Sequence, residues 1–192
     1  QADILHISNE VPFAVDCKDP VPKLSGKLTF CSKDSYFKLL EAVGADVVEL
    51  TGDHFQDSGE AALEHTLEVY KQNKLPYYGG GLNIEEAKQP VKFEIRGTKI
   101  AFLGCNAKPT TYGNATEEKG GNFRCDWDYM TAEVKKLRSE GYLPIVTFQH
   151  LEFYQWTAQS QLVADFHKMA DAGAVVVSGS QSHQPHGMEI TD

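Results

Sequence analysis

Short apolar runs alternate along the chain with segments whose apolar residues recur at helical spacing. The runs are typical of buried strands and cover residues 3–7, 46–51, 76–78, 143–148 and 174–177. Between them, apolar stripes predict amphipathic helices: Tyr36, Leu40 and Val43; Leu63, Leu67 and Tyr70; Trp127, Met130, Val134 and Leu137; Leu162, Phe166 and Met169. This alternation predicts an α/β fold in which crossover helices join parallel strands.

Local signals refine this picture at several points. Ser32 is placed to cap the first helix, Gly44 to end it, and Asn83 to cap a brief helix over 84–88. Residues 91–95 alternate apolar with polar side chains, and a turn at Gly97 leads into an apolar strand over 99–103, which predicts a β-hairpin. The polar stretches 11–26 and 108–122 are predicted loops, and with no repeat or linker we expect one domain over residues 1–192.

Four of the predicted strands end in residues that bind metals or move protons. Glu10 follows the first, and Asp53 and His54 follow the second after Gly52; the later strands lead to His150 with Glu152 and to His183. In α/β sheets ligands bind outside the carboxyl ends of the strands, so this convergence predicts a metal site of the hydrolase type.

Each of these residues also has a plainer interpretation. Asp53 suits a cap for the helix that starts near Gly59, which would leave His54 in solvent. His150 can be an ordinary loop histidine or an imidazole that Glu152 orients, and His183 can lie in a flexible polar turn. We expect His6, His65 and His167 to be structural or surface residues.

The charge and hydropathy of the chain argue against binding to nucleic acids and against a membrane-spanning segment. The chain has 27 acidic and 18 basic residues, a net charge of −9, which does not suit a nucleic-acid binder. No apolar run approaches the roughly 20 residues that cross a bilayer. Because the chain starts at Gln1, we expect processing, and any contact with a membrane would need a segment that is not present in this sequence.

The four cysteines, Cys17, Cys31, Cys105 and Cys125, fit no zinc-binding spacing. They form either two disulfides, with three connectivities open, or four buried thiols. Pairing the sequence neighbours would close one irregular loop in each half of the chain, as is common in secreted proteins.

Several blocks of the sequence resemble the CapA (PgsA) family of capsule and poly-γ-glutamate synthesis proteins. The blocks occur in family order and cover residues 2–10, 46–59, 75–87, 90–104, 149–174 and 179–189. That family is similar in turn to calcineurin-like metallophosphatases. The resemblance implies a four-layer α/β/β/α sandwich with one or two metal ions at the strand ends.

The resemblance also implies roles for individual residues. Glu10 would be a metal-bridging carboxylate, and Asp53 would bind metal where the family usually has asparagine. His54 would protonate a leaving group or hold an oxyanion. His150 and His183 would be metal ligands, and Glu152 an outer acid that touches the substrate. Mixed imidazole and carboxylate donors favour Mn, Zn or Fe.

Two departures from the family pattern change these expectations. The family loop Gly-His-His-Pro-His is here 179–183, Gly-Ser-Gln-Ser-His, which predicts weaker metal binding, by a single ion or by none. The first family strand, which ends in Gly-Asp, is absent, and the C-terminal end looks cut short. We therefore expect a partner chain or a cleaved N-terminal segment to supply the missing strand.

Three functions follow as hypotheses. The first is an extracytoplasmic metal-dependent hydrolase or transferase that acts on an anionic polymer or a phosphoester. The second is a non-catalytic surface protein that kept the fold, lost metal ligands, and binds polymer or assembles with its own kind. The third is a cytosolic nucleotide phosphatase, which would have four free thiols and a metal site.

Overall fold

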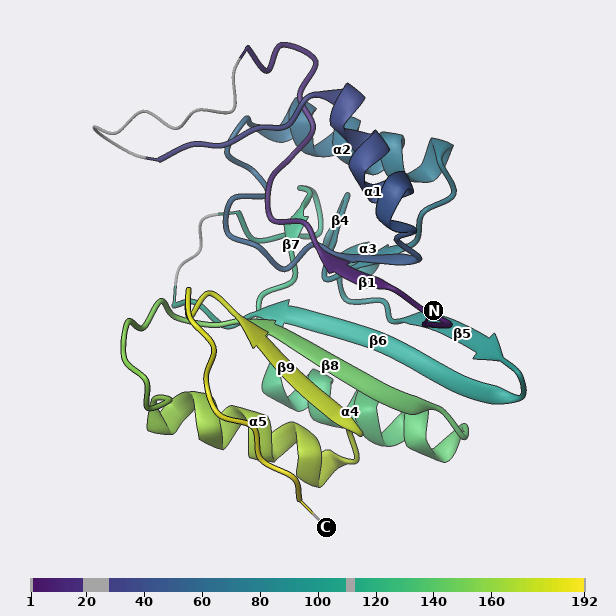
Figure 1. The fold of residues 1–192 in the computed structure, drawn as a ribbon, viewed down its shortest axis with the longest axis vertical. Coiled ribbons are helices and arrows are strands. Elements are labelled where there is room, and N and C mark those ends of the chain that lie inside the picture. The colour runs from purple at the N-terminus through teal and green to yellow at the C-terminus, as the bar shows by residue number, and fades with distance from the viewer. Residues whose placement is uncertain (1, 19–27, 110–112, 192) are drawn as a thin grey trace.

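A computed structural model describes residues 2–18, 28–109 and 113–191 of the chain. Four layers are visible in Figure 1, where the helices α1 and α2 cover one sheet, a second sheet lies beneath it, and α4 and α5 cover the outer face of that second sheet. The α/β/β/α sandwich expected from the resemblance is therefore the observed architecture.

The first sheet contains three parallel strands in the order β1-β2-β3. These are β1 (His6–Ser8), β2 (Val47–Glu49) and β3 (Tyr77–Tyr78). Val47 and Val48 are fully buried, because one face of β2 packs under the helices and the other against the second sheet.

The second sheet has the strand order β5-β6-β8-β9. The predicted hairpin is confirmed as the antiparallel pair β5 (Val91–Ile95) and β6 (Thr98–Asn106), and β8 (Leu143–Gln149) and β9 (Val176–Ser180) continue the sheet in parallel. A small antiparallel pair, β4 (Gly80–Gly81) with β7 (Gly121–Asn122), lies beside them.

Three of the predicted helices match the structure closely. The helix α2 (Glu60–Gln72) buries Leu63, Leu67 and Tyr70 as its stripe predicts. The helices α4 (Trp127–Ser139) and α5 (Ser160–Ala172) bury Met130, Val134, Leu137 and Met169 against the second sheet. In the short α3 (Ile84–Ala87), the Asn83 side chain accepts a 2.9 Å hydrogen bond from the Glu86 amide, as expected of a cap.

The first helix differs from its prediction. A 3-10 turn, η1 (Asp34–Tyr36), precedes α1 (Phe37–Val43), and Ser32 does not cap either one because its backbone pairs with the segment around Phe13. The buried residue of α1 is Phe37, whereas Tyr36 and Val43, from the predicted stripe, are exposed. Gly44 ends α1 in a left-handed conformation, as predicted.

Other boundaries shift by a few residues. The strand predicted over 3–7 covers His6–Ser8, and the one predicted over 174–177 covers Val176–Ser180. The predicted loop over 11–26 lies outside the described residues from position 19 onward, and in the loop over 108–122 residues 110–112 do. The described remainder of that second loop contains β7, which the sequence did not predict.

Both disulfides join sequence neighbours, Cys17 with Cys31 and Cys105 with Cys125. Of the three connectivities left open, the structure therefore has the local one. The four free thiols expected of a cytosolic nucleotide phosphatase are not found, since all four cysteines are paired.

The two sheets meet in a core that contains both apolar and polar contacts. Val47, Tyr78 and Phe102 are buried between them. The Tyr78 hydroxyl lies 2.9 Å from the Thr147 hydroxyl of the second sheet and 2.8 Å from His6 Nε2 of the first. These contacts fix how the strand ends of one sheet lie relative to those of the other.

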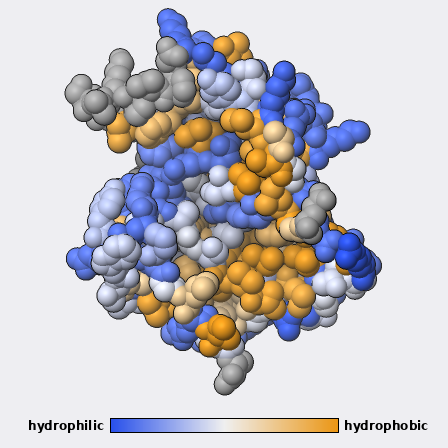
Figure 2. All heavy atoms as spheres, viewed as in Figure 1, coloured by the Kyte–Doolittle hydropathy of each residue, from blue (hydrophilic) through white to orange (hydrophobic). Residues whose placement is uncertain are grey.

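The surface carries some exposed apolar side chains. Figure 2 shows hydrophobic residues gathered over β8 and β9. Val176, the first residue of the edge strand β9, and Val175 just before it are each about half exposed. None of the helices in the described ranges is long and apolar enough to cross a lipid bilayer.

Candidate metal centre

Glu10, Asp53 and His54 come together at the carboxyl ends of β1 and β2. One ligand atom of each residue lies within 4.8 Å of the others. The two strands are parallel neighbours, so residues that follow them emerge at the same edge of the sheet. Gly52 makes the approach feasible, because a β-carbon there would lie 2.5 Å from Glu10 Cγ.

Asp57 holds the His54 ring. Its Oδ2 lies 2.5 Å from His54 Nδ1 and also accepts a 2.9 Å hydrogen bond from the Phe30 amide. The Asp57 side chain is only 1% exposed, so the carboxylate is fixed in place. With Nδ1 bound to Asp57, Nε2 is the ring nitrogen available to a metal or a substrate.

Glu10 is held by groups from the second sheet. The Gln149 amide at the end of β8 donates a hydrogen bond to Glu10 Oε1. Asn106, at the end of β6, donates to Gln149 Oε1 and to the Thr51 carbonyl, each at 2.8 Å. Both amide side chains are buried, so this network ties the strand ends of the two sheets together.

Lys108 and Gln181 bridge Asp53 to Glu152. The Lys108 Nζ lies 2.6 Å from Asp53 Oδ2 and 3.8 Å from Glu152 Oε1. The Gln181 amide nitrogen lies 3.4 Å from Asp53 Oδ1 and 3.3 Å from Glu152 Oε1. Asp53 therefore does not cap α2, whose N-cap residue is Gly59.

The two carboxyl groups at the centre have opposite pKa shifts. Burial and the hydrogen bond with Asp53 raise the pKa of Glu10 above its usual range. Burial alone would raise the pKa of Asp53, but hydrogen bonds with Lys108 and Glu10 and the charge of Lys108 lower it. Of the two carboxyl groups, Asp53 is therefore the stronger acid and Glu10 the weaker one.

His150 lies apart from this group. It is 3% exposed, its Nε2 lies 3.0 Å from Asp165 Oδ2 in α5, and Gln161 donates to the other oxygen of Asp165 at 2.9 Å. The carboxylate that orients His150 is thus Asp165, and the orienting role considered for Glu152 is wrong. His150 Nδ1 is buried without a hydrogen-bond partner in the described part of the chain.

His183 and Glu152 lie further out. The His183 side chain is about half exposed, stacks on Tyr154, and has its Nε2 3.8 Å from Glu152 Oε1. Glu152 in turn reaches Asp53 only through Lys108 and Gln181. The structure thus brings Glu10, Asp53 and His54 together, and ligation by His150 and His183 stays a prediction.

His6, His65 and His167 have structural or surface contacts, as expected. His6 stacks on Phe102 between the sheets, His65 pairs with Asp34, and His167 pairs with Glu189.

The donor set suits a divalent transition metal. Two carboxylates and one imidazole offer mixed oxygen and nitrogen ligands, which favour Zn, Mn or Fe over Ca or Mg. The ligand atoms of these two half-buried acids and of His54 lie within 4.8 Å of one another, and a cation between them would offset the repulsion of the two carboxylates. Glu10, Asp53 and His54 therefore fit a bound cation.

Sequence reasoning missed Asp57, Lys108, Gln149 and Asp165. Two of them had a usable signal: Asp57 follows His54 by three residues, and Asp165 interrupts the apolar stripe of α5 between Leu162 and Met169. A buried carboxylate in such a position needs a partner. Lys108 and Gln149 carry no comparable signal.

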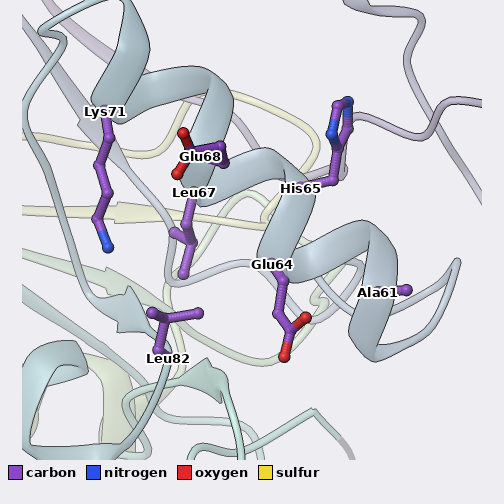
Figure 3. Close-up of a pocket in the computed structure, with 7 residues that line it drawn as sticks. All are labelled: Ala61, Glu64, His65, Leu67, Glu68, Lys71 and Leu82. Carbon is purple, nitrogen blue, oxygen red and sulfur yellow. The ribbon is translucent and has the colours of Figure 1, made fainter.

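A hollow of about 420 Å³ lies elsewhere on the molecule, along α2 (Figure 3). Its described lining includes Glu64, His65, Glu68 and Lys71 and none of the residues at the metal centre. Its two glutamates and its histidine do not form a group close enough to hold a metal ion, whereas in the described part of the chain the strand ends do.

Comparison with known proteins identifies relatives over most of the chain. The family described as "Bacterial capsule synthesis protein PGA_cap" matches residues 1–192. The capsule biosynthesis protein CapA of Bacillus anthracis is 25% identical over 187 residues, 95% of this chain and 45% of that protein. The PGA biosynthesis protein CapA of Bacillus subtilis (strain 168) is 22% identical over 153 residues, 79% of this chain and 40% of that protein.

The chain thus spans less than half the length of these curated relatives. Among solved structures, the Haemophilus influenzae NAD nucleotidase NadN matches with a TM-score of 0.52 and 15% identity, over 81% of this chain and 27% of that one. At that identity the likeness concerns the fold alone, a metallophosphatase-like α/β sandwich. With the family match over its whole length, the chain belongs to the bacterial capsule synthesis proteins of the PGA_cap family.

Proposed function

We propose that this chain works outside the cytoplasm in capsule or poly-γ-glutamate synthesis, as a metal-dependent hydrolase or transferase acting on an anionic polymer or a phosphoester. The observation that carries the proposal is the convergence of Glu10, Asp53 and His54 within 4.8 Å. Family membership supports the process, and the name of the Bacillus subtilis relative includes PGA biosynthesis.

The charges at the centre support a requirement for a metal. Glu10 lies beside Asp53, and the Lys108 ammonium contacts Asp53 and Glu152, so three carboxyl groups lie near one ammonium. A polyanionic substrate approaching these carboxylates would be repelled unless further positive charge is present. A bound divalent ion would supply that charge, polarise the scissile group and acidify a water molecule.

The protein groups have separate tasks in this proposal. Glu10 and Asp53 hold the ion, and Gln149 fixes the orientation of Glu10. His54, held by Asp57 at Nδ1, presents Nε2 to the ion as its third ligand. Glu152, which is partly exposed beside Lys108, contacts the substrate at the rim.

The proposed location rests on the two disulfides. Such bonds persist in oxidising compartments and are rare in the cytosol. Mass spectrometry of protein purified from its natural host, alkylated without reduction, should find no free thiols.

A second candidate function is supported by the partners of Asp53. Lys108 and Gln181 already satisfy both of its oxygens, and serine and glutamine occupy loop positions where the family has histidine. A carboxylate satisfied by protein groups has less need of a metal, which suits a non-catalytic polymer-binding protein.

Metal analysis and turnover separate the two candidates. The proposal expects about one Mn or Zn per chain by elemental analysis. It also expects cleavage or transfer of poly-γ-glutamate or a phosphodiester in added metal, and loss of both properties in Glu10→Gln and in Asp53→Asn. Glu140→Gln, which removes a carboxylate from a surface ion pair, is the matched control and should change neither.

The opposite result would favour the binding protein. Wild-type chain that contains no metal, shows no turnover in added Mn or Zn, and still retains poly-γ-glutamate on a column would exclude the catalytic proposal.

A further inference from the structure

Lys108 enters the acidic cluster from the segment that follows β6. Its side chain is 12% exposed, its Nζ donates to Asp53 Oδ2 at 2.6 Å, and Glu152 Oε1 lies 3.8 Å away. Its backbone amide also donates to Asn106 Oδ1 at 2.9 Å, which anchors the lysine to the network behind Glu10. The ammonium is thus a cation held at a defined place between two carboxylates.

The side chains around this ammonium are those that would bind a metal. Asp53, Glu152 and Gln181 come from the segments after β2, β8 and β9, and each carries an oxygen donor. The Gln181 amide touches both carboxylates, and turning it over would place its oxygen where its nitrogen now lies. A cation in the position of Nζ would thus have oxygen donors from Asp53 and Glu152, and Gln181 lies against both of these carboxylates.

We propose that the Lys108 ammonium takes the place of a second metal ion, so that the centre binds one divalent cation, at Glu10, Asp53 and His54, and is closed to another. This inference deepens the proposed function and rests on its metal site. A divalent ion beside Nζ would be repelled by the ammonium and would have to compete with it for Asp53 Oδ2.

A purely structural salt bridge and a lysine that replaces a metal ion predict different effects of removing the Lys108 charge. If Lys108 only stabilised the fold, removing its charge would lower stability and leave metal binding unchanged. If it replaces an ion, removing its charge leaves Asp53 and Glu152 without their shared counter-charge, and a second metal should enter.

The test compares Lys108→Met and Lys108→Gln with wild type. Manganese or zinc bound per chain would be measured by elemental analysis after gel filtration and by titration calorimetry. Wild type should bind about one ion, and both variants about two, as in two-metal sites. Lys108→Arg, which keeps the charge, should stay at about one.

Lys92→Met is the matched control, because Lys92 forms a surface ion pair with Glu140. It should bind the same amount of metal as wild type. Circular dichroism would verify the fold of each variant, and the wild-type stoichiometry tests the inference without any substitution.

Two results would overturn the inference and leave the proposed function standing: two ions on the wild-type chain, or a single ion on folded Lys108→Met and Lys108→Gln. Absence of metal from wild type and from both variants would overturn both. Metal uptake by the variants alone would support the role of Lys108 and contradict the proposed function of the wild-type protein.

Discussion

His54 is oriented by a hydrogen bond with the Asp57 carboxylate and by edge-on packing against the Phe30 ring. Asp57 is three residues away in the same loop, and its other oxygen, Oδ1, is buried with no hydrogen-bond partner in the described chain. The carboxylate accepts from His54 and from the Phe30 amide through one oxygen only. Removing the charge of Asp57 should therefore change the orientation of His54 more than it changes the stability of the fold.

Asp57→Asn should reduce metal affinity and any turnover by about 10- to 100-fold, as is typical for partners that orient a metal-site histidine. The amide no longer stabilises the correct tautomer and charge of the ring. Calorimetric titration with Mn and Zn would measure the loss. Unchanged affinity and turnover in a folded Asp57→Asn protein would show that His54 needs no orienting carboxylate.

For individual residues, the sequence predicted the three that come together at the candidate site but not the residues that hold them in place. Glu10, Asp53 and His54 could be chosen because each directly follows an apolar run that ends in a polar loop. Lys108 lies in a long polar loop where lysine is ordinary, and Gln149 is chemically unremarkable until the fold places it against Glu10. Such pairings depend on long-range contacts, which local patterns do not encode.

Among the elements, the long helices were predicted more accurately than α1 and than the short strands β4 and β7. The thirteen-residue helix α2 shows several turns of its apolar stripe, whereas α1 has seven residues and buries Phe37 on a different face from the one predicted. The strands β4 and β7 have two residues each, and the β-strand periodicity needs longer runs. Glycine-rich segments of this size become strands only because the surrounding fold pairs them.

The Cys105–Cys125 disulfide links the end of β6 to the segment before α4, across 20 residues. Replacing both cysteines with alanine should lower the free energy of unfolding by about 3 kcal/mol, from the loop that the bond closes in the unfolded chain. Urea denaturation of the variant and of wild type would measure it. A loss well below about 1 kcal/mol would mean that other contacts already restrain this loop.

The same bond adjoins Asn106, which donates to the Thr51 carbonyl and to Gln149 behind the metal centre. We therefore expect the double variant to bind metal more weakly as well.

For the whole molecule, the contact between the sheets contains a titratable group. Glu49 is 3% exposed in β2, and it accepts a hydrogen bond from Thr51. The Tyr78 and Thr147 hydroxyls, which join the sheets, lie close to it. Burial raises the pKa of Glu49 above its usual 4.5.

This raised pKa gives the stability a predictable dependence on pH. Between pH 4.5 and the folded pKa, the folded chain keeps the Glu49 proton and the unfolded chain releases it, so the free energy of unfolding should fall as the pH rises through that range. Glu49→Gln keeps an acceptor for Thr51 and cannot ionise, so its unfolding free energy should fall less.

Urea unfolding of both proteins from pH 4.5 upward would measure this difference. Glu117→Gln, at an exposed position, controls for the loss of one carboxylate. Parallel curves for wild type and Glu49→Gln would show that Glu49 contributes nothing to the pH dependence.

The candidate metal ligands follow strands of the first sheet, and three residues that contact them or their partners lie at or just after the ends of strands of the second sheet. Glu10, Asp53 and His54 follow β1 and β2, while Lys108, Gln149 and Gln181 belong to the strand ends of the second sheet. A substitution in the core between the sheets, for example at Phe102, could shift one sheet relative to the other. Such a shift would move these two sets of residues apart. The affinity of the candidate centre for an added divalent ion, measured in solution, would then report how well the two sheets are aligned.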